Sequence, residues 1–161
     1  MTDSGLMLAN AVCYAVGKAL QGISGVNLGI TAFPGANKAK RGATVVPVLR
    51  HGEKLTARFP EVAYGMTPMA ESLWWVMQQM YFLRESRKII LIITDGEPDS
   101  IPAAQEAFKQ AQKKGFECCG LGIMCSNIAT LLPHTSRVIE TLPQLAPALF
   151  ELLEGAFRRN T

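Results

Sequence analysis

The chain has 161 residues, of which 48% are hydrophobic and 18% are charged, and its formal net charge at pH 7 is +3. A chain of this length and composition forms a folded domain rather than a disordered segment, so we expect one domain over residues 1–161. The basic residues lie in short clusters without interleaved aromatic residues, which argues against nucleic acid as a partner. No apolar run is long enough to span a membrane and no signal peptide is recognised, so no membrane partner is predicted.

Helical and extended patterns alternate along the chain. In chain order we predict a helix over 5–21, strands over 26–33 and 43–49, a helix over 67–83, a strand over 88–94, a helix over 101–114, strands over 116–124 and 137–140, and a closing helix over 143–157. Pro47 places the second strand at a sheet edge. The strand KIILIIT (88–94) is apolar throughout, as in a parallel sheet covered on both faces. This order predicts a three-layer α/β/α, doubly wound (Rossmann-like) fold with a mostly parallel sheet.

The four cysteines lack the paired Cys-x-x-Cys spacing of zinc sites. They are Cys13, Cys118, Cys119 and Cys125, and the first three lie in apolar stretches. Buried free thiols in a reducing compartment explain this pattern better than disulfide bonds do. We therefore expect a cytoplasmic protein.

The segment IILIITDGEPDS (89–100) places Asp95 directly after the most apolar strand. Ligands of open parallel sheets bind beyond the carboxyl ends of the strands, so this carboxylate is a candidate site residue. The magnesium aspartate of a nucleoside triphosphatase is excluded because the chain has no GxxxxGK[ST] loop. A helix-loop-helix calcium site fits poorly, because Ser100 stands where that loop needs glycine. A turn at Asp95-Gly96, with Asp99 or Ser100 capping the next helix, leaves Asp95 itself unexplained.

The segments YGMTP (64–68) and IILIITDGEPD (89–99) together resemble the von Willebrand factor A (VWA) domain. In that family a Gly-x-Thr-Pro loop supplies a threonine, and a strand-terminal Thr-Asp-Gly supplies an aspartate, to a metal-ion-dependent adhesion site that binds Mg²⁺ or Mn²⁺. The resemblance implies that Thr67 and Asp95 are metal-site residues, and their oxygens are the ligands that hard cations prefer. The segments TPMAESLWW and TDGEPD are most similar to those of a bacterial subgroup of the family. That subgroup resembles the cobalt-chelatase subunit that works with an AAA+ ATPase.

One part of the family pattern has no counterpart. The first strand of VWA domains ends in Asp-x-Ser-x-Ser, which supplies three further ligands, whereas DSGLM (3–7) has Gly5 and Met7 in place of the serines. The sequence therefore resembles a VWA domain that lacks its first strand. Asp3 or Ser4 could substitute as ligands, although capping the first helix is the simpler role for either. With two protein ligands, we expect Mg²⁺ or Mn²⁺ to bind weakly or not at all.

The resemblance implies a protein–protein interaction module and not an enzyme, with a protein partner such as an AAA+ ATPase or a chelatase-like complex. Two alternatives stay open. One is a structural domain without metal, and the other is a metal-dependent hydrolase whose general base would have to be Glu97 or Asp99. His51 and His134 lie in separate loops without a matching nucleophile, so neither indicates catalysis.

The resemblance also has a consequence for the sheet. The strand order of the family is similar to 3-2-1-4-5-6, so the absent first strand would lie between the strands at 26–33 and 88–94. Two unpaired edges at a sheet centre would leave backbone groups without hydrogen-bond partners. Either these two strands pair directly, or a second copy lends a segment and forms a homodimer. We favour the homodimer slightly, because unpaired edges recruit strands from other chains.

Overall fold

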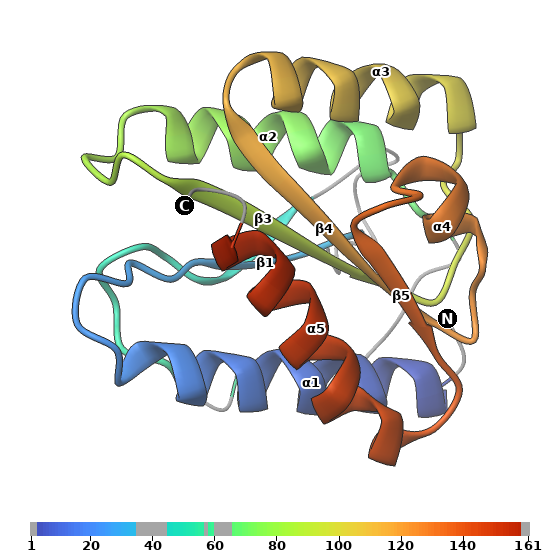
Figure 1. The fold of residues 1–161 in the computed structure, drawn as a ribbon, viewed down its shortest axis with the longest axis horizontal. Helices are drawn as coiled ribbons and strands as arrows, with labels where there is room; N and C mark the ends of the chain where they lie inside the picture. Colours follow the sequence, from blue (N-terminus) through green and yellow to red (C-terminus); the bar gives the residue numbers. More distant parts are fainter. Residues whose placement is uncertain (1–2, 35–44, 57, 60–65, 159–161) are drawn as a thin grey trace.

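The computed structural model describes residues 3–34, 45–56, 58–59 and 66–158 (Figure 1). The elements are α1 (Asp3–Gln21), β1 (Ile30–Ala32), β2 (Val46–Leu49), α2 (Met69–Tyr81), β3 (Lys88–Thr94), α3 (Ile101–Lys113), β4 (Phe116–Ile123), α4 (Asn127–Leu131), β5 (Ser136–Ile139), a 3₁₀ helix (Leu142–Gln144) and α5 (Leu145–Arg158). The predicted alternation of helices and strands is confirmed. None of the described helices is both long and apolar enough to cross a membrane.

The described strands form two sheets. β3, β4 and β5 make a parallel three-stranded sheet in which β4 is central, with Leu91 opposite Cys119 and Gly122 opposite Val138. β1 and β2 make an antiparallel pair. Pro47 lies in β2, which among the described strands pairs with β1 alone, so the predicted edge position is confirmed. β1 and β3 do not pair with each other, so the direct pairing that the sequence left open is not found.

β1 is shorter than the predicted strand at 26–33. The residues before it are held by loop contacts instead of a ladder. Asn27 Oδ1 accepts a hydrogen bond from the main-chain N of Gly52 at 3.0 Å. A Cβ atom on Gly29 would lie 2.6 Å from the His51 ring, so the ring approaches the backbone closely there. Such long-range contacts override the extended pattern. Residues 43 and 44 of the predicted second strand lie outside the described residues.

Helices cover the β3–β4–β5 sheet on both faces (Figure 1). α2 and α3 lie on one face, where Ile90 and Ile92 of β3 join their apolar residues in one core cluster. α1 and α5 lie on the other face, where Leu121 and Ile123 of β4 join a second cluster. Alternation along each strand therefore sends successive side chains into different clusters. This is the three-layer α/β/α arrangement expected from the sequence.

Burial is less complete at β3 than the apolar sequence KIILIIT predicts. Seven of the eight β4 residues are buried, and only Glu117 is partly exposed. On β3, Ile90 and Ile92 are buried, but Ile89, Leu91 and Ile93 are only half-buried. Among the described strands, β4 has a neighbour on each side, whereas β3 is paired on one side only. This difference accords with the less complete burial of β3.

The helix termini follow the sequence signals at α3 but not at α2. Ser100 caps α3, because its Oγ accepts a hydrogen bond from the main-chain N of Ala103 at 3.3 Å. Gly115 follows α3 with φ +82, a left-handed conformation that favours glycine. At α2 the helix begins at Met69, two residues after the predicted start. The capping position is Pro68, and no side chain caps that end.

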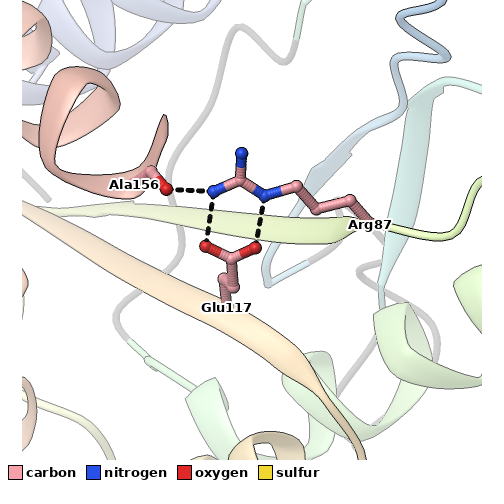
Figure 2. A network of polar contacts seen from close by, with 3 residues as sticks. All are labelled: Arg87, Glu117 and Ala156. Carbon is pink, nitrogen blue, oxygen red and sulfur yellow. Dashed lines mark hydrogen bonds and ion pairs between the residues drawn. The ribbon is translucent and has the colours of Figure 1, made fainter. Parts of the chain in front are cut away.

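A polar network fixes the amino end of the sheet (Figure 2). Arg87, just before β3, donates from Nε to Glu117 Oε1 at 2.5 Å and from Nη2 to Glu117 Oε2 at 2.7 Å. Arg87 Nη2 also donates to the main-chain carbonyl of Ala156 in the last turn of α5. A cation suits the carbonyl end of a helix, and a two-pronged carboxylate pair fixes its direction. The network therefore connects the last turn of α5 to the amino ends of β3 and β4.

Candidate metal centre

Two loops meet at the carboxyl end of β3: residues 66–68 before α2 and residues 95–99 before α3. The main-chain N of Thr67 donates to Asp99 Oδ1 at 2.7 Å, and the main-chain N of Asp99 donates to the Thr67 carbonyl at 3.0 Å. This reciprocal pair of hydrogen bonds fixes Thr67 relative to the loop that carries Asp95. From the sequence, Asp99 was a candidate cap for α3 or a candidate general base, and not a hydrogen-bond partner of Thr67. Two features of the sequence could have indicated another role for Asp99. It follows the same strand as Asp95, and the adjacent Ser100 can provide the cap by itself.

The Thr67 side chain lies against the residue that follows Asp95. A Cβ atom on Gly96 would be 2.9 Å from Thr67 Oγ1, so glycine is needed there for close approach. Thr94, which is 3% exposed, holds the turn from the other side. Its Oγ1 accepts from the main-chain N of Gly96 and donates to the Gly96 carbonyl, both at 3.1 Å. The structure thus brings the Thr67 hydroxyl to the Asp95 turn.

Asp95 itself is half-buried at the end of β3. Its neighbours Glu97 and Asp99 are exposed, and one oxygen of Asp99 accepts the Thr67 hydrogen bond. Figure 1 shows α1 beginning on the same side of the molecule as the carboxyl end of β3. The side chains of Asp3 and Ser4 lie outside the described residues. A role for either in the site stays a prediction.

The oxygen donors fit a hard divalent cation in type but not in number. A hydroxyl and a carboxylate suit Mg²⁺ or Mn²⁺. However, the described residues contain no group of three or more His, Cys, Asp or Glu side chains that could hold a metal ion. Mg²⁺ demands near-octahedral oxygen coordination and gives up water reluctantly. The predicted ligands Thr67 and Asp95 alone would therefore make an incomplete site.

Neither of the two histidines provides an acid–base group at this edge. His51 packs on Gly29, away from the Asp95 turn. Burial lowers the pKa of His51, and the charge of Glu85 partly offsets that effect. His134 is exposed in the loop before β5. Both histidines lie in loops, as the sequence predicts.

The cysteine thiols of the chain are free. Cys118, Cys119 and Cys125 are buried and Cys13 is half-buried. Burial raises the pKa of Cys13 to about 11 and the pKa of Cys118 to about 12. Thiols of that kind stay protonated near neutral pH, so they are poor nucleophiles and poor metal ligands. The predicted free thiols are confirmed.

No family model matches the sequence, and no curated protein matches it. Solved structures do. The proximal thread matrix protein 1 (PTMP1) from the mussel byssus is similar with a TM-score of 0.72 and 14% identity, over 92% of this chain and 41% of the PTMP1 chain. Manganese-loaded TRAP from Plasmodium vivax is similar with a TM-score of 0.64 and 14% identity, over 86% of this chain and 62% of the TRAP chain.

The fold is von Willebrand factor A-like. A second PTMP1 structure, described with a zinc-occupied MIDAS motif, has a TM-score of 0.70 at 13% identity, over 92% of this chain and 42% of that one. This VWA-like chain spans about two fifths of the PTMP1 chain and 62% of the TRAP chain. At such low identities the similarity establishes the fold. The metal-site roles of Thr67 and Asp95 stay predictions.

Proposed function

We propose that the chain is a protein-interaction module of the VWA type and not an enzyme, and that a partner docks at the carboxyl edge of β3. The observation that carries this proposal is the joined pair of loops at that edge. The reciprocal bonds between Thr67 and Asp99, with Thr67 Oγ1 against Gly96, hold a hydroxyl at the turn that follows Asp95. The described histidines lie elsewhere, so the arrangement suits binding better than proton transfer.

A divalent cation, Mg²⁺ or Mn²⁺, would be shared between the chain and its partner. Thr67 and Asp95 would hold it, and Asp3 or Ser4 would be the candidate additions from the start of α1. When bound, the cation supplies positive charge that an acidic side chain of the partner can ligate. The chain alone binds it weakly or not at all, because two protein ligands do not offset the loss of water. The manganese-loaded and zinc-occupied structures of similar fold support a metal at this place.

The split between β1 and β3 supports the absence of the VWA first strand, with its Asp-x-Ser-x-Ser motif, from the sheet. The TPMAESLWW and TDGEPD segments favour the bacterial subgroup similar to the cobalt-chelatase subunit, and therefore an AAA+ ATPase as the partner. The free thiols favour a cytoplasmic location.

A structural domain without metal is the second candidate function. The observation that favours it is that the described residues bring no third His, Cys, Asp or Glu side chain to a shared site. This candidate predicts that chelators and substitutions at Asp95 leave every interaction of the chain unchanged. No observation favours the hydrolase alternative.

The test is a Mn²⁺ titration followed by electron paramagnetic resonance, with and without a short soluble peptide that carries one glutamate. We expect weak binding by the chain alone and tighter binding when the peptide is present, because its carboxylate fills an open position. Asp95→Ala and Thr67→Ala should abolish the gain, whereas the matched control Glu97→Ala, an exposed carboxylate two residues away, should keep it. Equal Mn²⁺ binding by all of these variants would favour the structural domain.

A further inference from the structure

The sheet is interrupted between the free edges of β1 (Ile30–Ala32) and β3 (Lys88–Thr94), and we call this place the sheet break. Contacts before the two strands show that they are neighbours. The side chain of Glu85, three residues before β3, is hydrogen-bonded to Asn27, three residues before β1. Figure 1 shows β1 on the side of β3 opposite to β4. The sheet break is therefore an interruption within one layer of strands, not a boundary between unrelated parts.

Helices from both layers reach across the sheet break. On one side, α1 contacts β1 through Gly17, where a Cβ atom would lie 3.5 Å from Ile30 Cδ1. The adjacent Val16 packs in the same cluster as Leu91 of β3. On the other side, Phe33, directly after β1, packs against the cluster of α2, α3 and β3. A strand placed in the sheet break would therefore meet apolar side chains on both of its faces.

Burial falls step by step toward the sheet break. β4 is buried almost throughout, β3 is buried at alternate positions, and all three residues of β1 are only half-buried. Apolar residues flanked by helices on both faces are normally covered when a strand lies on each side. The exposed edges of β1 and β3 also carry main-chain groups that lack a strand partner among the described residues.

Glu85 adds a polar group at the amino end of the sheet break. Its Oε2 atom is buried and accepts no hydrogen bond from the described residues. Buried carboxylate oxygens normally have a donor. Main-chain N–H groups at the start of an added strand would be suitable donors. The unpartnered oxygen is thus a second observation, independent of the apolar surface, that points to an absent extended segment.

We propose that the sheet break accepts an extended apolar segment of a partner protein, which adds as a strand between β1 and β3. The segment has about seven residues, the length of β3, and apolar side chains on both faces. It runs parallel to both strands, since Figure 1 shows β1 and β3 running in the same direction. A second copy is a poorer occupant. Each of the five described strands already pairs within its own sheet, so a copy could lend one only by unpairing it. Strand addition of this kind uses main-chain hydrogen bonds for affinity and side-chain pockets for specificity.

The experiment follows amide hydrogen exchange of the full chain by NMR, with EDTA present so that metal-dependent docking does not contribute. The probe is a nine-residue peptide of seven Val and Ile residues between two solubilising lysines. In the free chain, the β3 amides that point away from β4 should exchange fast, while those bonded to β4 exchange slowly. The peptide should slow the fast set by about tenfold or more and leave β5 unchanged.

Matched peptides and variants make the outcome specific. A peptide with a central proline should protect β3 at least about tenfold less, because proline removes a ladder donor. Glu85→Gln should weaken binding of the valine–isoleucine peptide about threefold to tenfold, because the substitution removes the charged acceptor. The control Glu106→Gln, on the exposed face of α3, should not weaken it.

Slow exchange throughout β3 in the free chain would overturn the proposal. Protection of β5 or β2 in place of β3 would overturn it as well. Protection that rises with protein concentration without peptide, together with a dimer in sedimentation, would assign the sheet break to a second copy.

Discussion

The β3–β4–β5 half and the β1–β2 half of the molecule share helix α1 but differ in how completely they are buried. α1 contributes Ala9 and Val12 to the cluster that contains Leu121 of β4, and Val12 is fully buried. Toward β1 it contributes Gly17, which contacts half-buried Ile30. Apolar sequence is therefore not sufficient for burial. A strand also needs a neighbour on each side, because only then does the sheet present a continuous surface to the helices.

The largest expected effect comes from two leucines that lie on neighbouring strands and differ in burial. Leu121→Ala in β4, at a fully buried position, should lower the free energy of unfolding by about 3–5 kcal/mol. Leu91→Ala in β3, which packs against the same cluster but is half-buried, should cost about 1–2 kcal/mol. Urea denaturation followed by circular dichroism measures both. Equal losses would mean that the free edge of β3 does not weaken its packing.

Two glycines compare a crowded backbone position in β4 with an open one after α1. Gly122→Ala in β4 should destabilise the fold by about 2 kcal/mol or more, because the new Cβ atom would lie 2.1 Å from the Cys125 carbonyl oxygen. Gly22→Ala, after α1, has no heavy atom within 4 Å of the new Cβ atom and should change stability by no more than about 0.5 kcal/mol. Thermal unfolding of the two variants under identical conditions measures the difference. A tolerated alanine at 122 would show that the loop after β4 yields easily.

The joined loops at the carboxyl edge of β3 give an intermediate effect. Asp99→Ala removes the acceptor for the Thr67 main-chain N and should cost about 1–2 kcal/mol. The control Ser100→Ala removes the α3 cap and should cost about 1 kcal/mol. NMR separates them, since Asp99→Ala should shift the Thr67 and Gly96 signals and Ser100→Ala should shift the first turn of α3. Identical shift patterns would contradict a specific link between Thr67 and Asp99.

The smallest effect is a pH dependence confined to the β1 side. A hydrogen bond with its own main chain, then one with Asn27, lowers the pKa of Glu85 below its ordinary value of 4.5, and burial lowers that of His51 below 6.5. For both groups the folded pKa lies below the unfolded one. Each contribution to stability is therefore complete above the unfolded pKa and is lost as pH falls through the folded pKa.

Hydrogen exchange between pH 7.5 and 4 should consequently show β1 and β2 opening before β4 as the pH falls. Glu85→Gln should remove the part of this trend that begins below pH 4.5 and strengthen the part that begins below pH 6.5, because the charge of Glu85 no longer offsets the burial of His51. Uniform opening of both halves would show that the two groups do not act on the β1 side selectively.

The elements that the sequence predicted well depend on local patterns. The strand over 88–94 and the serine cap of α3 are decided by neighbouring residues, and both are confirmed by the structure. The shortening of β1 could not be predicted, because it depends on His51 approaching Gly29 from a different loop.

The candidate site divides in the same way. The position of Asp95 after a buried strand follows from the sequence pattern. The approach of Thr67 to that turn was implied only by the family resemblance, since the two segments are far apart in the chain. The bonds between Thr67 and Asp99 were not foreseen, because both use main-chain atoms that no side-chain motif reports.

The buried thiols have a practical consequence for measuring distances in this molecule. With pKa values of about 11 and 12, Cys13 and Cys118 are ionised to no more than about one part in ten thousand at pH 7, and maleimides react with the ionised form. Cys119 and Cys125 are shielded by burial. Cysteines introduced at Phe82 and Ile23, which are 86% and 52% exposed, should therefore accept spin labels while the native cysteines stay in place. Such a pair spans the loops that precede β3 and β1, and its separation would report directly on any widening between them.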